Sequence, residues 1–232
     1  DGRNLGVKFS YKEQTAPRGI AEAFLIADDF IKNVNTCLIL GDNLFYGSMQ
    51  FLRTALLENQ GATIFGYPVH DPERYGVVEF DAGGKVISIE EKPRKPKTRY
   101  AIPGLYCYDT HVLEFAKKLK PSSRGELEIT DLNKIYLKKG KLHVHLLGRG
   151  MAWLDTGTPE SLMEAGNFVA TIEHRQGFKI GCLEEVAYRM EYINLEQLIE
   201  LSKPIKNSAY GKYIMDIVAF EQNKKYFYTR GK

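Results

Sequence analysis

A short apolar run at residues 36–40 most constrains how this chain can fold, because it stops abruptly on the polar turn Gly41-Asp42-Asn43. Apolar runs of this length are typical of buried strands. Similar runs predict further strands at residues 7–11, 62–68, 76–80, 86–90, 101–108 and 142–147. Residues 19–32 have helical spacing and separate the first two runs, so the opening is expected to be a parallel strand–helix–strand unit.

The middle of the chain predicts an antiparallel portion. Two short alternating runs flank Asp81-Ala82-Gly83-Gly84, which is a hairpin signal. A helix that Ser48 can cap is expected to end before Gly61 and to lead into the strand at residues 62–68. The predicted class is therefore α/β with a mixed sheet.

The last third of the chain is predicted to be helical. Thr158-Pro159-Glu160 is a strong helix start and Gly177 a matching end, while Asn194 with Gln197 forms a capping-box pattern. We expect an α/β core over residues 1–177 and a helical extension over residues 178–232. The polar tail from residue 221 onward is expected to fray.

Composition excludes several classes of protein. The 232 residues carry a formal net charge of only +3, without a basic block, so no nucleic-acid partner is predicted. No apolar stretch approaches the roughly 18 residues of a membrane span, and no signal peptide opens the chain. Cys37, Cys107 and Cys182 lack any C-x-x-C spacing, which argues against a disulfide framework or a thiolate zinc site. A cytoplasmic setting fits these features.

Two carboxylates follow apolar runs and are candidate metal ligands. Ligands of parallel sheets collect beyond the carboxyl ends of strands, where Asp42 is expected, and a carboxylate there suits Mg²⁺. Asp155 follows Trp153-Leu154 just before a well-capped helix. Together the two could hold one metal ion. Each also fits a plainer structural role, since Gly-Asp-Asn is ordinary turn chemistry and Asp155 could cap or turn the chain.

Two further stretches could contact a ligand. Glu91 and Lys92 lie at the end of an alternating strand before Pro93, and could hold a sugar hydroxyl and a phosphate, although charged strand ends are also commonly solvated. Pro17 and Gly19 precede a helix, where a glycine lets a planar ligand approach the backbone. By itself that stretch is only a loop.

Six ordered stretches span nearly the whole chain: QTAPRGIAEAFLIADDFI, LILGDNLFYG, DPERYGVVEFDAGGKVISIEEKPRKPK, YAIPGLYCYD, PSSRGELEITDLN and GRGMAWLDTGTPESLMEAGNF. In this order they closely resemble the glucose-1-phosphate thymidylyltransferases, a sugar nucleotidyltransferase family. The resemblance implies a Rossmann-like nucleotide-diphospho-sugar transferase fold with a mixed sheet and C-terminal helices. It also implies a reaction, in which glucose 1-phosphate attacks the α-phosphorus of dTTP and yields dTDP-glucose and pyrophosphate.

Residue roles follow from matching the motifs. The resemblance implies that Asp42 and Asp155 bind Mg²⁺, and that Lys92 and Arg124 are catalytic cations that grip the sugar phosphate. The thymine base would contact Gln14, Pro17 and Gly19. The glucose would be lined by Tyr75, Gly76, Glu91, Ile102, Tyr106 and Trp153.

The resemblance further implies a place in dTDP-L-rhamnose biosynthesis and a homotetramer. A second nucleotide site for feedback inhibition by dTDP-rhamnose would lie between subunits. By position its candidates are Tyr46, Gly47 and Arg149, although these residues could equally pack at a subunit contact without any ligand.

One departure from the family is large. Family members begin with a strand and a G-x-G-T-R-L loop that wraps the triphosphate, and no such motif occurs in this sequence. We therefore expect a further upstream segment in the natural protein and very low activity of residues 1–232 alone. Three other functions stay open: a UTP-using sugar-phosphate nucleotidyltransferase, a metal-dependent glycosyltransferase, and a non-catalytic regulatory relative.

Overall fold

The computed structural model describes residues 1–229, with side chains as far as residue 223. Its strands are β1 (Thr36–Ile39), β2 (Asn43–Tyr46), β3 (Ala62–Pro68), β4 (Gly76–Phe80), β5 (Val86–Glu91), β6 (Tyr100–Ala101), β7 (Leu105–Tyr108), β8 (Leu142–Leu146) and β9 (Ala152–Asp155). Its α-helices are α1 (Glu22–Ile26), α2 (Asp28–Ile31), α3 (Gln50–Glu58), α4 (Val112–Ala116), α5 (Ile129–Lys138), α6 (Pro159–Gln176), α7 (Leu183–Arg189), α8 (Leu195–Ser202) and α9 (Ala209–Thr229). Short 3₁₀ helices span Arg3–Leu5, Pro72–Arg74 and Lys203–Ile205.

The chain divides into two compact units. One is Lys12–Ala165, and the other combines Asp1–Tyr11 with Gly166–Lys232. The division expected from the sequence differs in two places, because it put the boundary after residue 177 and kept residues 1–11 with the α/β core.

A mixed sheet forms the centre of the unit Lys12–Ala165. Within the described residues it has seven strands in the order β1-β7-β3-β6-β4-β5, with β8 paired to β3 off this path. The β3–β8 pair is parallel, and the other strand pairs of this sheet among the described residues are antiparallel. The predicted hairpin is confirmed, since β4 and β5 pair antiparallel with Gly76 opposite Glu91.

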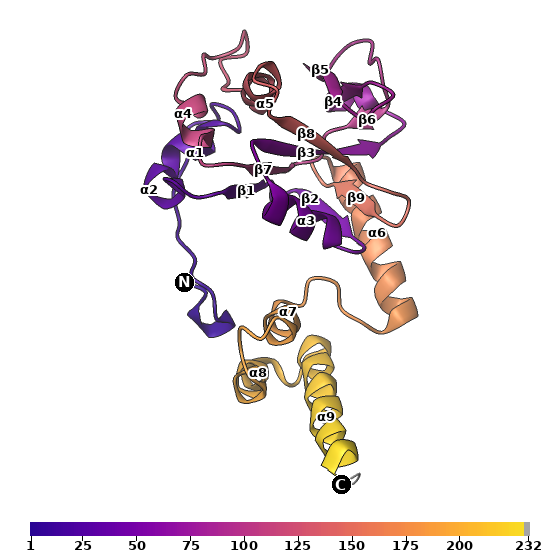
Figure 1. The fold of residues 1–232 in the computed structure, drawn as a ribbon. Helices are drawn as coiled ribbons and strands as arrows, with labels where there is room; N and C mark the ends of the chain where they lie inside the picture. Colours follow the sequence, from indigo (N-terminus) through magenta and orange to yellow (C-terminus); the bar gives the residue numbers. More distant parts are fainter. Residues whose placement is uncertain (230–232) are drawn as a thin grey trace. The chain divides into compact units, whose positions relative to one another are not determined.

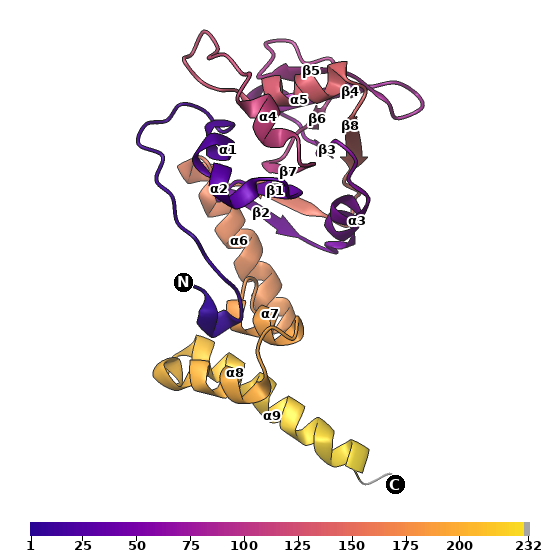
Figure 2. The same cartoon turned by 60° about the vertical axis from the view of Figure 1, so that its left-hand side comes forward.

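Alternate side chains of the sheet enter two cores, as the period of a strand requires. Ile64 on β3 packs into the cluster beneath α1, α4 and α5, whereas its neighbour Phe65 packs into a smaller cluster with α3. Figure 1 shows α1, α4 and α5 on one side of the sheet and α3 on the other. In the second view α3 again lies apart from these three helices (Figure 2). The sheet is therefore covered on both faces.

The opening of the chain differs from the sequence expectation. Residues 7–11 form no strand in the described structure, and Tyr11 is 79% exposed. The expected parallel unit is therefore wrong, because β1 pairs antiparallel with β7. An alternating pattern supplies one apolar face but does not choose a strand partner, which only tertiary contacts select.

Two predicted elements are split. The strand expected over residues 101–108 becomes β6 and β7, because Pro103 between them has no N–H to donate to a ladder. The helix expected over residues 19–32 becomes α1 and α2, which meet at Ala27, where the backbone leaves helical geometry with φ −93° and ψ 14°.

The C-terminal helices match their sequence signals. α6 begins at Pro159, where the Thr158 hydroxyl accepts from the Ser161 N–H, and Gly177 follows it with a φ of 75°. Both bonds of the capping box at Asn194 and Gln197 are present at the start of α8. The expected fraying is wrong as far as Thr229, since α9 continues through residues rich in helix-forming Lys and Gln. The expectation for residues 230–232 lies outside the described residues.

None of the helices among residues 1–229 combines the length and the apolar character that crossing a membrane requires.

Leu132 anchors α5 to the sheet and is fully buried, whereas Leu57 on α3 is 77% exposed. We expect Leu132→Ala to lower the free energy of unfolding by about 2–5 kcal/mol through lost burial and a residual cavity. The control Leu57→Ala should change it by no more than about 0.5 kcal/mol. Urea unfolding followed by circular dichroism measures both. Equal losses in the two variants would contradict this placement of α5.

Candidate active site

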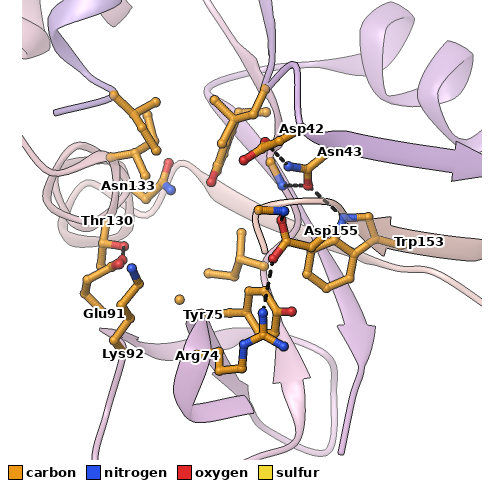
Figure 3. Close-up of a pocket in the computed structure, with 18 of the residues that line it drawn as sticks. Asp42, Asn43, Arg74, Tyr75, Glu91, Lys92, Thr130, Asn133, Trp153 and Asp155 are labelled. Atoms are coloured by element: carbon orange, nitrogen blue, oxygen red, sulfur yellow. Dashed lines mark hydrogen bonds and ion pairs between the residues drawn. The ribbon is translucent and has the colours of Figure 1, made fainter. Parts of the chain in front are cut away.

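A cavity of about 430 Å³ opens in the unit Lys12–Ala165 (Figure 3). Its wall combines carboxylates, two cations, aromatic rings and backbone, contributed by segments distant in sequence. The lining residues are Ile20, Leu40, Asp42, Asn43, Arg74, Tyr75, Gly76, Glu91, Lys92, Ile102, Gly104, Tyr106, Ile129, Thr130, Asn133, Trp153, Asp155, Gly157 and Thr158. Nine of the residues that the sequence nominated therefore lie at one cavity: Asp42, Tyr75, Gly76, Glu91, Lys92, Ile102, Tyr106, Trp153 and Asp155.

A small two-stranded ladder brings the two predicted metal ligands together. β2 and β9 pair antiparallel, with Asn43 opposite Asp155. The backbone carbonyl of Asp42 accepts from the N–H of Thr156 at 2.8 Å and from its hydroxyl at 2.9 Å. Asp42 and Asp155 are 113 residues apart in the sequence. Through this ladder both of them line the same cavity.

The side chain of Asn43 ties three walls of the cavity to one another. Its Oδ1 accepts from the Gly104 N–H at 2.8 Å and from the indole N–H of Trp153 at 2.7 Å. Its Nδ2 donates to Oδ1 of Asp42 at 2.7 Å. One amide thus holds β9, the segment before β7 and the Asp42 carboxylate in a fixed arrangement.

The donor set suits a hard cation that also binds the substrate. Asp155 Oδ1 accepts from the Gly157 N–H at 3.2 Å, which orients that carboxylate beside Asp42. Within the residues that the structure describes, no cluster of three or more His, Cys, Asp or Glu could hold a metal. Mg²⁺ commonly uses one or two carboxylates together with substrate phosphates and water, so the residues present fit this ion.

An aromatic wall borders Asp155. The rings of Tyr75 and Trp153 meet edge to face at 5.0 Å, and the guanidinium of Arg74 lies 5.3 Å from the Tyr75 ring centroid. Arg74 Nη2 also lies 3.7 Å from Asp155 Oδ2. Burial, followed by the Asp155 charge, raises the pKa of Tyr75 to about 12, so this phenol stays neutral at physiological pH.

Glu91 and Lys92 occupy another wall. The Thr130 hydroxyl on α5 donates to Glu91 Oε2 at 2.5 Å, which fixes the carboxylate at the cavity. Lys92 has a φ of 42°, in the left-handed region that side chains other than glycine rarely adopt. Backbone strain of this kind concentrates at functional sites, where the surrounding structure enforces it.

Arg124 does not line the cavity but lies beside it. Its Nη2 is 2.9 Å from Glu128 Oε2, and the same nitrogen is 3.9 Å from Glu91 Oε1. The hydrogen bond to Glu128 raises the pKa of this guanidinium further. Its contact with a sugar phosphate stays a prediction.

The three residues nominated for the base form a separate loop. Gln14 is exposed and donates its amide to the Gly19 carbonyl at 3.2 Å and to Glu22 Oε2 at 2.7 Å. Gly19 has a φ of 98°, and a Cβ there would lie 2.4 Å from the Leu127 carbonyl oxygen, so glycine is required. From this stretch only Ile20 borders the cavity; Gln14, Pro17 and Gly19 do not.

The three residues nominated for regulation also lie outside the cavity lining. Tyr46 pairs with Ala152 at the end of β2 farthest from Asp155. Gly47 follows it, and a Cβ there would lie 2.6 Å from the Gly150 carbonyl oxygen. Arg149 precedes Gly150 in the same turn, so the three residues belong to one region.

Sequence reasoning did not nominate ten of the lining residues, among them the polar side chains of Asn43, Arg74, Thr130 and Asn133. Asn43 was treated as part of a turn, although it immediately follows Asp42. Thr130 and Asn133 are three residues apart on α5, which places them on one helix face, and that spacing is a signal the sequence contains. Their burial was the part that could not be inferred.

Comparison with known proteins places this sequence and this fold in one class. The sequence profile of the family described as nucleotidyl transferase matches residues 1–172. A solved UDP-glucose pyrophosphorylase with bound UDP-glucose shares the fold at a TM-score of 0.63, with 23% identity over 70% of this chain and 66% of that one. The α/β architecture is thus that of the nucleotide-diphospho-sugar transferases.

Relatives with higher sequence identity identify the family within this class. A glucose-1-phosphate thymidylyltransferase of Neisseria meningitidis is 51% identical over 220 residues, which cover 94% of this chain and 76% of the relative. One of Xanthomonas campestris is 54% identical over 92% of this chain and 73% of its own. A Bacillus anthracis structure with that enzyme name, in complex with sucrose, has a TM-score of 0.66 and 42% identity over 72% of this chain and 67% of that chain. The chain belongs to the glucose-1-phosphate thymidylyltransferase family.

Trp153 is the single tryptophan of the chain and is 8% exposed, so its fluorescence reports on the Asn43 amide. We expect Asn43→Ala to shift the emission to longer wavelength and to lower the free energy of unfolding by about 2 kcal/mol, because buried N–H groups lose their acceptor. The exposed Asn207 supplies a matched control, Asn207→Ala. An unchanged Trp153 spectrum in Asn43→Ala would show that this amide does not hold β9.

Proposed function

We propose that the protein transfers a thymidylyl group from dTTP to glucose 1-phosphate. The observation that carries the proposal is the meeting of Asp42 and Asp155 with Glu91 and Lys92 at one cavity. The names of the relatives at about 50% identity support the substrate pair. In the reaction a phosphate oxygen of glucose 1-phosphate bonds to the α-phosphorus of dTTP, and the bond from that phosphorus to the pyrophosphate oxygen breaks.

We assign the metal to Asp42 and Asp155. Magnesium bound there would neutralise phosphate charge and hold donor and acceptor in line. The chain's own part is to orient both carboxylates. Asn43 does so for Asp42 and Gly157 for Asp155, each through an N–H donor.

We assign the sugar to the walls formed by Glu91 and Tyr75. Glu91, held by Thr130, would accept hydrogen bonds from sugar hydroxyls, while Lys92 would meet the phosphate as a point charge. Tyr75 and Trp153 supply flat, largely apolar faces that suit a pyranose ring. Gly76, Ile102 and Tyr106 complete this assignment, and Arg124 would approach the phosphate from beside Glu91.

We assign the base to the loop that contains Gln14, Pro17 and Gly19. An amide such as that of Gln14 can both donate and accept, which matches the edge of a thymine. Ile20 follows this loop directly and borders the cavity, so a nucleotide held by the loop would reach the carboxylates.

We further propose that the enzyme acts in dTDP-L-rhamnose biosynthesis in the cytoplasm, as a homotetramer with feedback inhibition by dTDP-rhamnose. The region of Tyr46, Gly47 and Arg149 is the candidate site for that inhibitor. Its separation from the cavity lining is consistent with a second nucleotide site.

Pyrophosphate release from dTTP and glucose 1-phosphate with Mg²⁺ tests the function in the natural protein that contains these residues. We expect Asp42→Asn and Asp155→Asn each to lower kcat by about 10²-fold or more, because charge on the phosphates is no longer compensated. EDTA should have the same effect. Asp216→Asn, an exposed position on α9, is the matched control.

Three outcomes would contradict the proposal. Faster release with UTP than with dTTP would favour the UTP-using alternative. Release of nucleoside diphosphate would favour a glycosyltransferase. Binding of glucose 1-phosphate without any turnover would favour a regulatory relative.

A further inference from the structure

A buried amide on α5 lacks a hydrogen-bond partner for its donor atom. Asn133 is 1% exposed, and its Oδ1 accepts from the Tyr108 hydroxyl at 2.7 Å. Its Nδ2 is the one buried side-chain polar atom among the described residues without a partner. Buried donors are almost always paired in folded proteins, so this exception requires an explanation.

The position of Asn133 supplies that explanation. Asn133 lines the cavity, together with Ile129 and Thr130 of the same helix. Figure 3 shows its amide reaching from α5 into the cavity, on the side opposite Asp155 and Trp153. The free donor is therefore directed toward the volume that a substrate would occupy.

The amide is also held rigidly. Tyr108 is fully buried, with its ring edge to face with Phe24 at 5.3 Å and close to Tyr136 at 5.6 Å. A phenol fixed in this way leaves the Asn133 amide little freedom to turn its donor elsewhere. Preorganised donors of this kind reject a ligand that lacks the matching acceptor, because they then stay unpaired.

The chemistry of the donor selects its acceptor. Asn133 and its partner Tyr108 are uncharged, and Tyr108 stacks on Tyr106, a buried phenol whose pKa is raised chiefly by burial. A phosphate is better matched by the cation of Lys92. A neutral N–H beside neutral rings suits a neutral oxygen, and the sugar supplies hydroxyls.

We infer that Asn133 is a specificity-determining residue whose Nδ2 donates a hydrogen bond to one hydroxyl oxygen of the hexose phosphate. This inference rests on the proposed function, because it takes glucose 1-phosphate as the ligand of the cavity. It adds a contact that Glu91, an acceptor, cannot make: a donor directed at the sugar.

Binding of deoxy sugars tests the inference. Calorimetry with the full chain compares glucose 1-phosphate with its 2-, 3-, 4- and 6-deoxy analogues. We expect one analogue to bind about tenfold more weakly because of its missing contact with Asn133. The double variant Asn133→Leu/Tyr108→Phe leaves neither partner unpaired. In this variant that analogue and glucose 1-phosphate should bind equally. The other three analogues should still differ from glucose 1-phosphate in affinity as they do in the unmodified chain.

Two controls keep the test decisive. Asn133→Leu alone also removes the donor, so it replaces the double variant if the latter does not fold. If all four differences persist in the variants, Asn133 does not read the sugar and the inference fails while the proposed function stands. If glucose 1-phosphate does not bind the unmodified chain, both fail.

A second inference rests on a different observation, the opposition of two cysteines in the sheet. Cys37 on β1 lies directly opposite Cys107 on β7. In the same register the Leu40 N–H donates to the Gly104 carbonyl at 2.9 Å. Hydrogen-bonded and non-hydrogen-bonded pairs alternate along an antiparallel ladder, so Cys37 and Cys107, three positions from that pair, form a non-hydrogen-bonded pair.

Non-hydrogen-bonded pairs bring opposite side chains closest. Their Cα atoms are typically about 4.5 Å apart, which lies within the range that a disulfide spans. A hydrogen bond between the two thiols lowers the pKa of Cys37 and, with burial, raises that of Cys107. Cys37 is half-buried while Cys107 is 1% exposed, so Cys37 is the thiol that meets an oxidant.

We propose that Cys37 and Cys107 are a reversible dithiol–disulfide pair that ties β1 to β7. The Cys37 thiolate attacks a small disulfide such as oxidised glutathione, and one glutathione thiolate leaves. Cys107 then loses its proton to solvent, and its sulfur displaces the second glutathione from Cys37. The two protein thiols are oxidised and the small disulfide is reduced to two thiols. The link would fix the strand that leads into Asp42.

Mass spectrometry of the full chain after treatment with oxidised glutathione tests this pair. We expect a product lighter by two hydrogen atoms, a linked peptide pair containing Cys37 and Cys107, and a free thiol at Cys182. The matched control Cys182→Ser should form the same link, whereas Cys107→Ser should stop at a glutathione adduct on Cys37. Adducts without the link in the unmodified chain, or two thiols that stay free, would overturn the proposal.

Discussion

The pairing of β2 with β9, secured by the amide of Asn43, is the interaction on which the candidate site depends. It places Asp42 and Asp155 at one cavity and holds Trp153 against Tyr75. Because Asn43 also accepts a hydrogen bond from Gly104, the small ladder is tied to the segment that directly precedes β7. A single side chain thereby couples the carboxylates, the aromatic wall and the main sheet.

The rest of the site is arranged around this point with little freedom. Thr130 of α5 orients Glu91 of β5, and Tyr108 of β7 orients Asn133 of α5, each through a hydrogen bond. Lys92 is kept in a left-handed backbone conformation at the end of β5. Preorganisation of this kind removes ordering costs from substrate binding and reserves the interactions for the reacting groups.

Local signals predicted the elements whose causes are local. The hairpin at Asp81, the helix start at Thr158 and the capping box at Asn194 were confirmed, since turn and cap chemistry acts over a few residues. The expected strand at residues 7–11 was wrong because a strand exists only through its partner. The two short strands of the β2–β9 ladder were not predicted, because they are distant in the sequence and each exists only through its pairing with the other.

The sequence by itself determined the class of fold, the family, and the identity of nine of the residues that line the cavity, because ordered motifs specify chemistry directly. Only the tertiary structure decided which of them meet. Asp42 and Asp155 are distant along the chain, and they come close together only through the long-range β2–β9 ladder, which no local pattern encodes. The same is true of Asn133, whose unpaired donor exists only because packing buries its helix face, and of Cys37 and Cys107, whose opposition is a matter of register.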